Sequence, residues 1–457
     1  MKEDRVREMN FEGDKPKNRE SELSEGQCLS IGSRFAQRKV TDLKDSGIPW
    51  IGEIPKDWEV AQVRNLFKIT RGRVIAATEM NEKGLYPVYS SQTENNGCMG
   101  YIDTFDYEGE AITWTTDGAK AGSVFYRNGQ FNCTNICGIL QKKEEREENI
   151  HFFTYAIGYS ADINKRPDIN GFKIMSNEMA SIKIVYPPLI EQKAIAEFLD
   201  RKCGEIDELV ALQDKMIEEL KAYKQSIITE TVTKGLNPNV PLKDSGIEWI
   251  GEIPQHWKID KTIRLFDKIG SGTTPKSMDE ANFYGTINWI QSGDINGGIL
   301  TRCKNQISEK TLEEYSALKV FKSPFIIIAM YGASVGNTSL SMIDGSVNQA
   351  CCVLSNGKMN KDYSFLVIKS CKDYWLKKAV GGGQPNISQD TIKSTWLPLP
   401  PLSEQQEIAD FLDKKCSEID SLIKLKQKKK DTLKDYKKSI IYEYVTGKKR
   451  NNFNHDL

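Results

Sequence analysis

An eighteen-residue phrase occurs twice in this chain of 457 residues, and the repeat restricts the fold more than any other feature. It reads LKDSGIPWIGEIPKDWEV from Leu43 and LKDSGIEWIGEIPQHWKI from Leu242. Two tryptophans, two glycines and a proline keep their places. Such a match does not arise by chance, so either a whole domain is duplicated or a docking element is repeated. The sequence that follows each copy decides between these alternatives.

A second phrase is also written twice. PPLIEQKAIAEFLDRKCGEIDELV starts at Pro187 and PPLSEQQEIADFLDKKCSEIDSLI starts at Pro400. These two starts lie farther apart than Leu43 and Leu242 do, by fourteen positions. The region between the two phrases is therefore fourteen residues longer in the second copy. The order that results is a variable domain, a helix, a second variable domain and a second helix.

Each proline pair opens a long helix, because no proline follows it for over forty residues. Apolar residues then alternate at spacings of four and three for about five heptads, which is typical of a coiled coil. The predicted seam is Ile195, Leu199, Ile206, Leu209, Met216, Leu220, Tyr223 and Ile227 in the first helix, and Ile408, Leu412, Ile419, Leu422, Leu433, Tyr436 and Ile440 in the second. Forty helical residues span about 60 Å, too far for one small domain to bury, so each helix is expected to pair with its duplicate.

The direction of that pairing follows from the short link between the first helix and the second domain, TKGLNPNVPLKDSG. If the two domains lie at opposite ends, the helices run antiparallel with an approximate two-fold axis. The first helix leaves through ITETVTKGLNPN and the second through the similar IYEYVTGKKRNN. We therefore predict that the end of the second helix lies beside the start of the first domain.

The domains between these landmarks are predicted to be mixed α/β, and the fold class to be α+β. Short β runs include YPVYSS, AITWTT and SVFYRN in the first domain and INWIQS, FIIIAM and CCVLS in the second. ITWTTDGAKAGSVFY from Ile112 aligns with IIIAMYGASVGNTSL from Ile326, so in both a strand enters a Gly-Ala-x-x-Gly turn and a second strand follows. Trp50, Trp58, Trp249 and Trp257 are expected to pack in cores.

The predicted boundaries are a disordered N-terminal extension at 1–40, domains at 41–187 and 237–400, long helices at 188–236 and 401–448, and a flexible C-terminus at 449–457. The extension is charged and carries few large apolar residues, so it cannot bury enough surface to offset the entropy of ordering.

Composition argues against several classes of function. Lysine plus arginine equals aspartate plus glutamate at 63 each, so net charge says nothing for or against nucleic acid. Ten cysteines without a CxxC pair, and three histidines, make a zinc site improbable and favour reduced, buried thiols. The absence of a membrane-length apolar run and of a signal-peptide core predicts a cytoplasmic protein. No cofactor and no metal is expected.

Catalytic motifs are missing as well. GSGTTPK from Gly270 has the wrong spacing for a phosphate-binding loop, and YPPL from Tyr186 lacks the asparagine of an amino-methyltransferase tetrapeptide. Three histidines, none beside a plausible nucleophile, serve acid–base or covalent catalysis poorly. We expect that this chain catalyses nothing by itself.

The doubled G-I-x-W-I-G-E-I-P-x-x-W phrase, the doubled P-P-L-x-E-Q-x-x-I-A-x-F-L-D helix start and GQPNIS at Gly383 resemble the specificity subunit of type I restriction–modification systems. The resemblance runs from about Leu43 to Lys448; the N-terminal extension departs from it. It implies two target recognition domains separated by two long helices in an antiparallel coiled coil. It further implies that each domain reads one half of a bipartite site in double-stranded DNA. The helices would set the spacing and dock two methyltransferase subunits, and two restriction subunits (an ATP-dependent nuclease and translocase) would complete the complex, with adenine methylation and cleavage belonging to the partners.

Residues expected to contact DNA are basic side chains near loops and polar side chains on the aligned turn, because phosphates need cations and base edges need hydrogen bonds. They are Arg64, Lys68, Arg71, Arg73, Lys120 and Arg127 in the first domain, and Thr273, Thr274, Lys276, Arg302, Lys304, Ser334, Asn337 and Gln349 in the second. Arg71-Gly72-Arg73 is interpreted as a loop tip and Gln349 as a polar residue in an apolar strand. Solvated surface is the alternative for each.

The second helix is also biased toward positive charge. From Lys414 to Lys438 it carries ten lysines and four acids, whereas the first helix is near balance. Such a face can follow a DNA backbone or an acidic partner, or it can be solvated.

Three other functions stay open on the sequence. The chain could be a self-contained nuclease, a coiled-coil DNA-binding scaffold without sequence reading, or a silent cassette that donates recognition domains by recombination.

Overall fold

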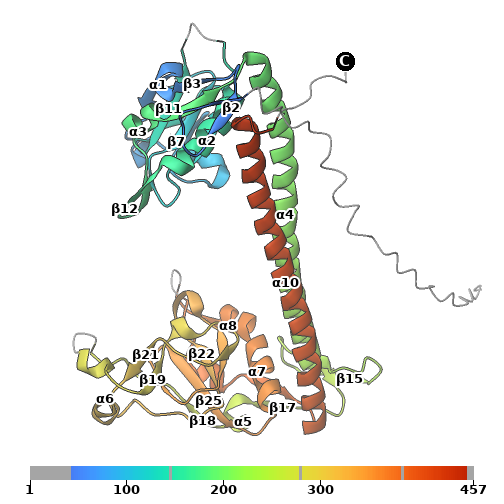
Figure 1. The fold of residues 1–457 in the computed structure, drawn as a ribbon. Coiled ribbons are helices and arrows are strands. Elements are labelled where there is room, and N and C mark those ends of the chain that lie inside the picture. The colour runs from blue at the N-terminus through green and yellow to red at the C-terminus, as the bar shows by residue number, and fades with distance from the viewer. Residues whose placement is uncertain (1–42, 144–146, 277–279, 382–384, 450–457) are drawn as a thin grey trace, which may run out of the picture. The chain divides into compact units, whose positions relative to one another are not determined.

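The computed structural model describes residues 43–143, 147–276, 280–381 and 385–449. The predicted N-terminal extension and nearly all of the predicted C-terminal tail lie outside these residues. The chain divides into two compact units, Met1–Val210 with Thr432–Leu457, and Ala211–Asp431. Helices α4 (Leu189–Lys234) and α10 (Leu402–Val445) each contribute one part to either unit (Figure 1). A unit therefore holds one mixed α/β domain, the start of one long helix and the end of the other.

The domain of the first unit is built on a four-stranded antiparallel sheet in the order β4-β11-β7-β9. Its strands are β4 (Phe67–Arg71), β11 (Cys137–Lys142), β7 (Ala111–Thr115) and β9 (Val124–Arg127). Smaller sheets flank it, formed by β5 (Tyr86–Tyr89), β6 (Cys98–Ile102) and β10 (Asn132–Cys133), and by β8 (Asp117–Gly118), β12 (Arg166–Asp168) and β13 (Gly171–Lys173). Helix α2 (Ile150–Asn164) packs on β7 and β9, and its apolar side chains join the core of this unit.

The domain of the second unit repeats the order of the main sheet as β18-β25-β22-β23, with β20 added at the edge. These strands are β18 (Phe266–Gly270), β25 (Cys351–Gly357), β22 (Phe325–Ala329), β23 (Thr338–Ser341) and β20 (Ile299–Leu300). A second sheet holds β19 (Ile287–Ile290), β21 (Asn305–Ile307) and β24 (Ser346–Val347). Helix α7 (Lys361–Ser370) contacts β23 as α2 contacts β9. All six expected β runs form strands.

The aligned Gly-Ala-x-x-Gly segments form the same turn in both units. Gly118 and Gly122 have φ of 97° and 83°, and Gly332 and Gly336 have φ of 72° and 77°, values that favour glycine. The hydrogen bonds also correspond. The amide of Gly122 donates to the carbonyl of Thr115, and the amide of Gly336 to that of Ala329, at 2.9 and 2.8 Å. Each turn joins two antiparallel strands of the main sheet, β7 to β9 and β22 to β23.

The repeated eighteen-residue phrase folds into a small ribbon, β1 (Leu43–Asp45) with β2 (Glu53–Pro55) in the first unit and β15 (Leu242–Asp244) with β16 (Glu252–Pro254) in the second. The C-terminal end of a long helix contacts each repeated phrase. In the first unit Lys448 Nζ donates to the carbonyl of Glu53 at 2.7 Å, and Tyr444 shares a core with Trp58. In the second, Val232 shares a core with Trp257. The first of these arrangements agrees with the predicted place of the second helix's end.

The second tryptophan of each phrase binds the start of the other long helix in its unit. Trp58 Nε1 donates to Glu191 Oε2 at 3.0 Å, and Trp257 Nε1 donates to Glu404 Oε2 at 2.9 Å. Both rings are buried. The glutamine that follows each glutamate binds the residue that caps the start of a domain helix, since Gln192 and Gln405 accept from the backbone amides of Asn149 and Asn360. The two repeated phrases therefore bind each other and join each α/β domain to the start of a long helix. We call this contact the joint.

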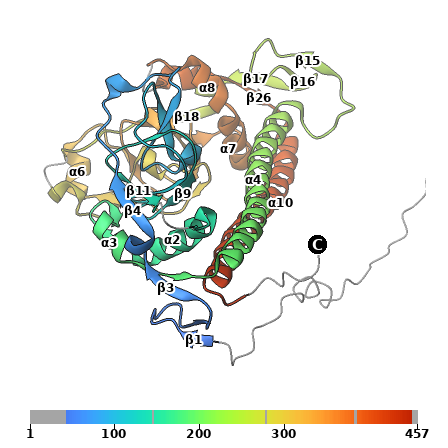
Figure 2. The ribbon, with the colours of Figure 1, turned by 90° about the horizontal axis from the view of Figure 1, so that it is seen from above.

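Parts of α4 and α10 lie side by side in both views (Figures 1 and 2). In the first unit Lys437 Nζ contacts both carboxylate oxygens of Asp207. In the second, Lys224 Nζ contacts both oxygens of Asp420, and Lys430 is bonded to Asp214. Among the described residues, no helix is both long and apolar enough to cross a membrane.

The buried side of the long helices differs from the predicted seam. Ile195, Leu199, Ile206, Ile408, Leu412, Ile419 and Ile440 are buried. Four predicted seam residues instead face solvent, with exposed fractions of 42%, 51%, 47% and 55%: Leu209, Tyr223, Leu422 and Tyr436. Met216, Leu220, Ile227 and Leu433 are half-buried.

The reason is a change of phase near each helix start. Cys203 is buried and Cys416 half-buried, so the stripe advances by four residues twice before the 4-3 alternation begins. From that point every second position of the stripe lies one residue later than predicted, while the positions between them, such as Ile206 and Ile419, keep the predicted phase. In α4 the half-buried Val210 and the buried Ile217 therefore take the places predicted for Leu209 and Met216.

Candidate nucleic-acid interface

The Gly118–Gly122 turn places Lys120 at the surface of the first unit. Beside it, β13 of the β12–β13 hairpin pairs with β8, so Phe172 lies opposite Gly118. The hairpin connection carries Ile169, whose side chain is 99% exposed. A two-stranded ribbon of this kind fits the major groove of DNA. This hairpin was not among the predicted strands, although RPDINGFK, with a proline and an Asn-Gly pair, carries a turn signal.

The basic run from Arg64 to Arg73, which includes β4, is partly exposed to solvent and partly bonded to other residues of the domain. Arg64 and Lys68 are exposed. Arg71 is the last residue of β4, and its Nε donates to the carbonyl of Asn135. Arg73 contacts Glu79 at 2.7 Å and Asp106 at 2.9 Å, and its hydrogen bonds to these carboxylates raise its pKa. The Arg71-Gly72-Arg73 segment is therefore bonded to its neighbours and is not the free loop tip that we expected.

Arg127 corrects the sequence-based expectation more strongly. Its side chain is only 3% exposed, its Nε donates to Thr113 Oγ1 at 3.0 Å, and its guanidinium lies 3.5 Å from the centre of the Tyr89 ring. Burial lowers its pKa. A group held in this way presents no charge to a DNA phosphate, so Arg127 belongs to the core of the domain.

In the second unit the structure brings two predicted residues together. Thr274 Oγ1 donates to Gln349 Oε1, and both side chains are exposed. Gln349 lies in the connection between β24 and β25, so it is not in an apolar strand as expected. Thr273 is half-buried, its carbonyl accepting from Trp289, and Lys276 is exposed.

The remaining candidates of the second unit lie in two other places. Arg302 and Lys304 are exposed on the segment after β20. Ser334 and Asn337 are half-buried on the Gly332–Gly336 turn. Asn337 Oδ1 accepts a 2.8 Å hydrogen bond from Lys372 Nζ, so its amide oxygen is already engaged.

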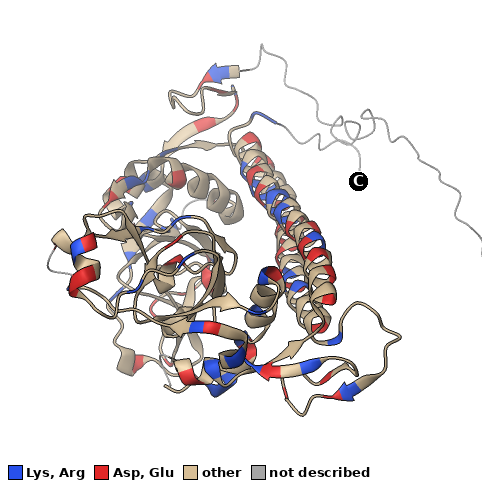
Figure 3. Ribbon diagram, turned by 90° about the horizontal axis from the view of Figure 1, so that it is seen from below, with Lys and Arg blue, Asp and Glu red and all other residues tan. Residues whose placement is uncertain are grey.

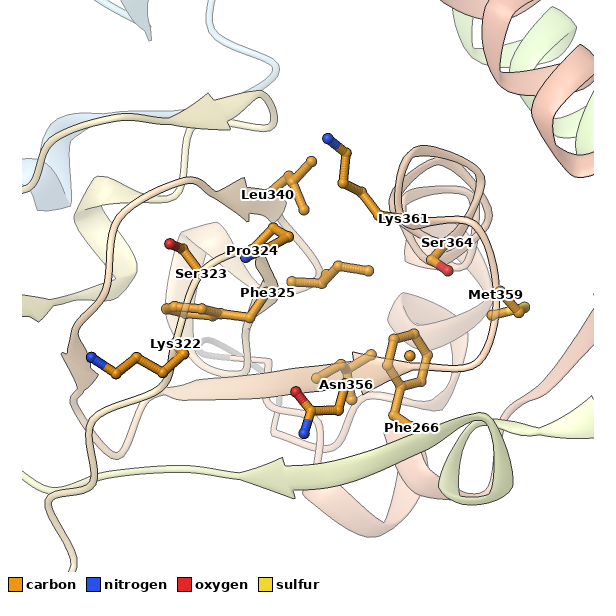
Figure 4. A pocket seen from close by; sticks show the side chains of 13 residues that line it. Phe266, Lys322, Ser323, Pro324, Phe325, Leu340, Asn356, Met359, Lys361 and Ser364 are labelled. Atoms are coloured by element: carbon orange, nitrogen blue, oxygen red, sulfur yellow. The ribbon is translucent and has the colours of Figure 1, made fainter.

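A pocket of about 270 Å³ lies at the edge of the main sheet of the second unit. Figure 4 shows Lys322 and Lys361 on opposite sides of it, with Phe325 and Leu340 between them. Lys322 contacts Asp344 at 2.8 Å, and this hydrogen bond lowers the pKa of Asp344 to about 2. Polar and apolar side chains both line it, and its described residues do not pair a nucleophile with a base.

Within the described ranges, no cluster of three histidine, cysteine, aspartate or glutamate side chains has a geometry that could hold a metal ion. The described cysteines are free thiols and most are buried. Burial raises the pKa of Cys203 to about 11, which makes its reactive thiolate scarce at neutral pH.

Both signs of charge line α4 and α10 (Figure 3). The lysine excess of α10 is partly neutralised, because Lys430 and Lys437 are bonded to aspartates of α4. Lys424, Lys429, Lys434 and Lys438 are exposed. Lys438 and Lys165, which the sequence analysis did not select, face a cavity that also holds Lys120.

One family model matches the chain twice, over residues 55–222 and 254–435; it is described as the type I restriction modification DNA specificity domain. The chain is 26% identical to the specificity subunit of the type I restriction enzyme MjaVIII from Methanocaldococcus jannaschii, over 87% of this chain and 94% of that one. It is 34% identical to the specificity subunit of the type I restriction enzyme MpnII from Mycoplasma pneumoniae, over 37% of this chain. That alignment spans 52% of the relative, or about half of its length.

Among solved structures, the fold is similar to a chain from work on complex assembly and conformational transition of the type I R-M system. The TM-score is 0.63 at 15% identity, and the match covers 86% of this chain and 99% of that one. At that identity the likeness bears on the fold alone.

Proposed function

Because the chain belongs to the type I restriction–modification DNA specificity family, we propose that it is the DNA-recognition subunit of a type I complex and that each unit reads one half of a bipartite site. The proposal is supported by a turn that has the same backbone conformation in both units but carries different side chains. The Gly118–Gly122 and Gly332–Gly336 turns share conformation and hydrogen bonds, but one presents Lys120 where the other presents Ser334. A shared scaffold with different side chains on its loops suits two modules that read different bases.

The long helices are proposed to form an antiparallel coiled coil with an approximate two-fold axis, which sets the distance between the half-sites. The support is a pair of matched contacts. When the helix start at Pro187 is aligned with that at Pro400, Asp207 falls on Asp420 and Lys224 falls on Lys437. Lys437 binds Asp207 in the first unit, and Lys224 binds Asp420 in the second. Reciprocal use of one contact is what a two-fold axis produces.

The same proposal assigns the chemistry to partners. Two methyltransferase subunits would dock on the helices, and two restriction subunits would complete the complex in the cytoplasm. The assembled complex would methylate adenine and cleave DNA with ATP, while this chain determines which DNA sequence is recognised. A coiled-coil scaffold or a silent recombination cassette is the alternative. Neither alternative requires that the two turns carry different side chains.

An exchange of residues 59–186 for the corresponding segment of a divergent relative tests independent reading. This segment leaves Trp58 and Glu191 in place, so the joint to the helix is kept. Methylated adenines are mapped across a genome in cells that also express the methyltransferase partner. One half of the methylated site should change while the other half and the gap remain. Changes in both halves would contradict the proposal, and a matched exchange in the second unit should alter the opposite half.

A further inference from the structure

The first unit contains a cavity of about 500 Å³ between three segments that are far apart in the sequence. Its walls are the Gly118–Gly122 turn, helix α2 and the last turns of α10. Four lysines line it, and Asp162 is the only acid among the described lining residues. The lysines come from all three walls: Lys120, Lys165, Lys437 and Lys438.

Two of these lysines are already paired and two are not. Lys437 binds Asp207, and Lys165 binds Asp162. Lys120 and Lys438 are exposed, and no carboxylate of the described residues lies within ion-pair distance of either ammonium group. Ammonium groups that line one cavity repel one another, and an anion between them relieves that repulsion. The cavity therefore has a positive charge that the described residues do not neutralise.

The second unit has a cavity of about 430 Å³ that shares two of these walls, α7 in the place of α2 and the end of α4 in the place of the end of α10, and is completed by Gly297–Ile299 and the start of α10. It is lined by Lys224 and Lys369 but by three acids, Asp362, Asp410 and Asp413. Burial and the nearby Lys224 lower the pKa of Lys369. In the repeat, Lys438 corresponds to Gln225, and Lys120 corresponds to Ser334. The second unit thus keeps the helix walls of the cavity, but its Gly332–Gly336 turn is not part of the lining and acids balance its lysines.

We propose that the basic cavity of the first unit binds a backbone phosphate of the DNA, with Lys120 and Lys438 as its ligands, and that the second unit has no equivalent contact. The inference rests on the proposed function, since the cavity shares the turn assigned there to base reading. A phosphate is the occupant that fits, because it is a compact anion presented on the molecule that this turn would contact. Charge interactions would then contribute more to the binding of the first half-site than to the binding of the second.

The test is the salt dependence of DNA binding by the full-length chain assembled with its methyltransferase subunits. The probe is a duplex that carries the methylated sequence, and a scrambled duplex is the reference. Each phosphate contact contributes about 0.9 to the slope of log K against log salt. Lys120→Ala with Lys438→Ala should lower the magnitude of that slope by about 1, the contribution of one phosphate, and weaken binding to both duplexes by a similar factor. Arginine at both positions should restore the slope.

Lys44→Ala with Lys56→Ala is the matched control, because both lysines are exposed in the same unit and neither lines the cavity. The control should leave the slope unchanged. Lys120→Ala with Lys438→Ala could also leave the salt slope unchanged in a complex whose wild type prefers its own duplex. In that case the phosphate site is wrong and the proposed function stands. If the pair instead prevents assembly with the methyltransferase subunits, the cavity holds an acidic protein surface and the inference is overturned. A wild-type complex with no preference for its duplex would refute the proposed function itself.

Discussion

Replacing Trp58 by phenylalanine tests whether the repeated phrases form the joint between domain and helix. The substitution removes the indole N–H that donates to Glu191 Oε2 at 3.0 Å, at a site where the ring is 1% and the glutamate 8% exposed. A hydrogen bond to a charged group contributes about 1.5–3 kcal/mol, and the smaller ring leaves part of a packed core unfilled. Together these losses should lower the free energy of unfolding by about 3 kcal/mol.

Trp257→Phe is the same change in the second repeat, and it should cost less. Glu404 keeps its 2.7 Å contact with His256 Nε2, and its side chain is 34% exposed, so water can replace the lost indole. We expect about 2 kcal/mol. Trp50→Phe is the control, because this ring is only partly buried and packs on Tyr159; it should cost less than about 1 kcal/mol.

Urea unfolding of the full chain, followed by circular dichroism, measures these differences, and hydrogen exchange assigns each to its unit. Trp58→Phe should weaken protection of the first unit and Trp257→Phe that of the second. A cost for Trp58→Phe no larger than that for Trp50→Phe would show that the indole–carboxylate contact does not hold the joint. The same conclusion would follow if either variant loosened both units equally.

The seam position can be checked by placing lysine at two nearby sites of α4: Leu209→Lys should change stability by less than about 0.5 kcal/mol because Leu209 is exposed, whereas Ile217→Lys should cost more than about 3 kcal/mol because Ile217 is buried. A larger cost in urea unfolding for Leu209→Lys than for Ile217→Lys would support the sequence-based seam instead. The pH dependence near Asp344 follows from a folded pKa of about 2 against an ordinary value of 3.8. Its contact with Lys322 stabilises the fold above pH 3.8, and this contribution is lost as the pH falls through 2; an NMR titration that gives Asp344 a pKa near 3.8 would contradict the contact.

The periodic features of the fold could be predicted from the sequence, because repeats and periodicity report directly on local structure. The two glycines of each Gly-Ala-x-x-Gly segment predict a turn that only a positive φ satisfies, and both turns form. The phase of the helix stripe could not be predicted. Leu209 and Tyr223 are apolar and fit a strict heptad, but from Cys203 and Cys416 onward every second position of the stripe lies one residue later. Hydrophobicity alone does not distinguish an exposed leucine from a buried one.

The candidate site was harder to predict, because contacts between distant residues decide which charges are free. Arg127 and Lys120 look alike in the sequence, yet one is buried under Tyr89 and the other lines a basic cavity. The Trp58–Glu191 joint did leave a signal in the sequence. The tryptophan phrase and the Glu-Gln helix start both recur, although the distance between the two copies differs from one phrase to the other. Two segments that persist while the chain between them changes length are candidates for direct contact.

We propose that the paired helices keep the two recognition modules a fixed distance apart. A heptad inserted into both helices tests this spacing role most directly. Within the second unit Lys430 is bonded to Asp214 and Lys224 to Asp420, so the bond between residues 215 and 216 lies opposite the bond between 428 and 429. Seven residues at each point keep the stripe in phase and add about 10.5 Å, or about three base pairs at 3.4 Å each. Methylation mapping should then find the same two half-sites separated by about three more base pairs. An active complex whose half-sites keep their original separation would contradict the account.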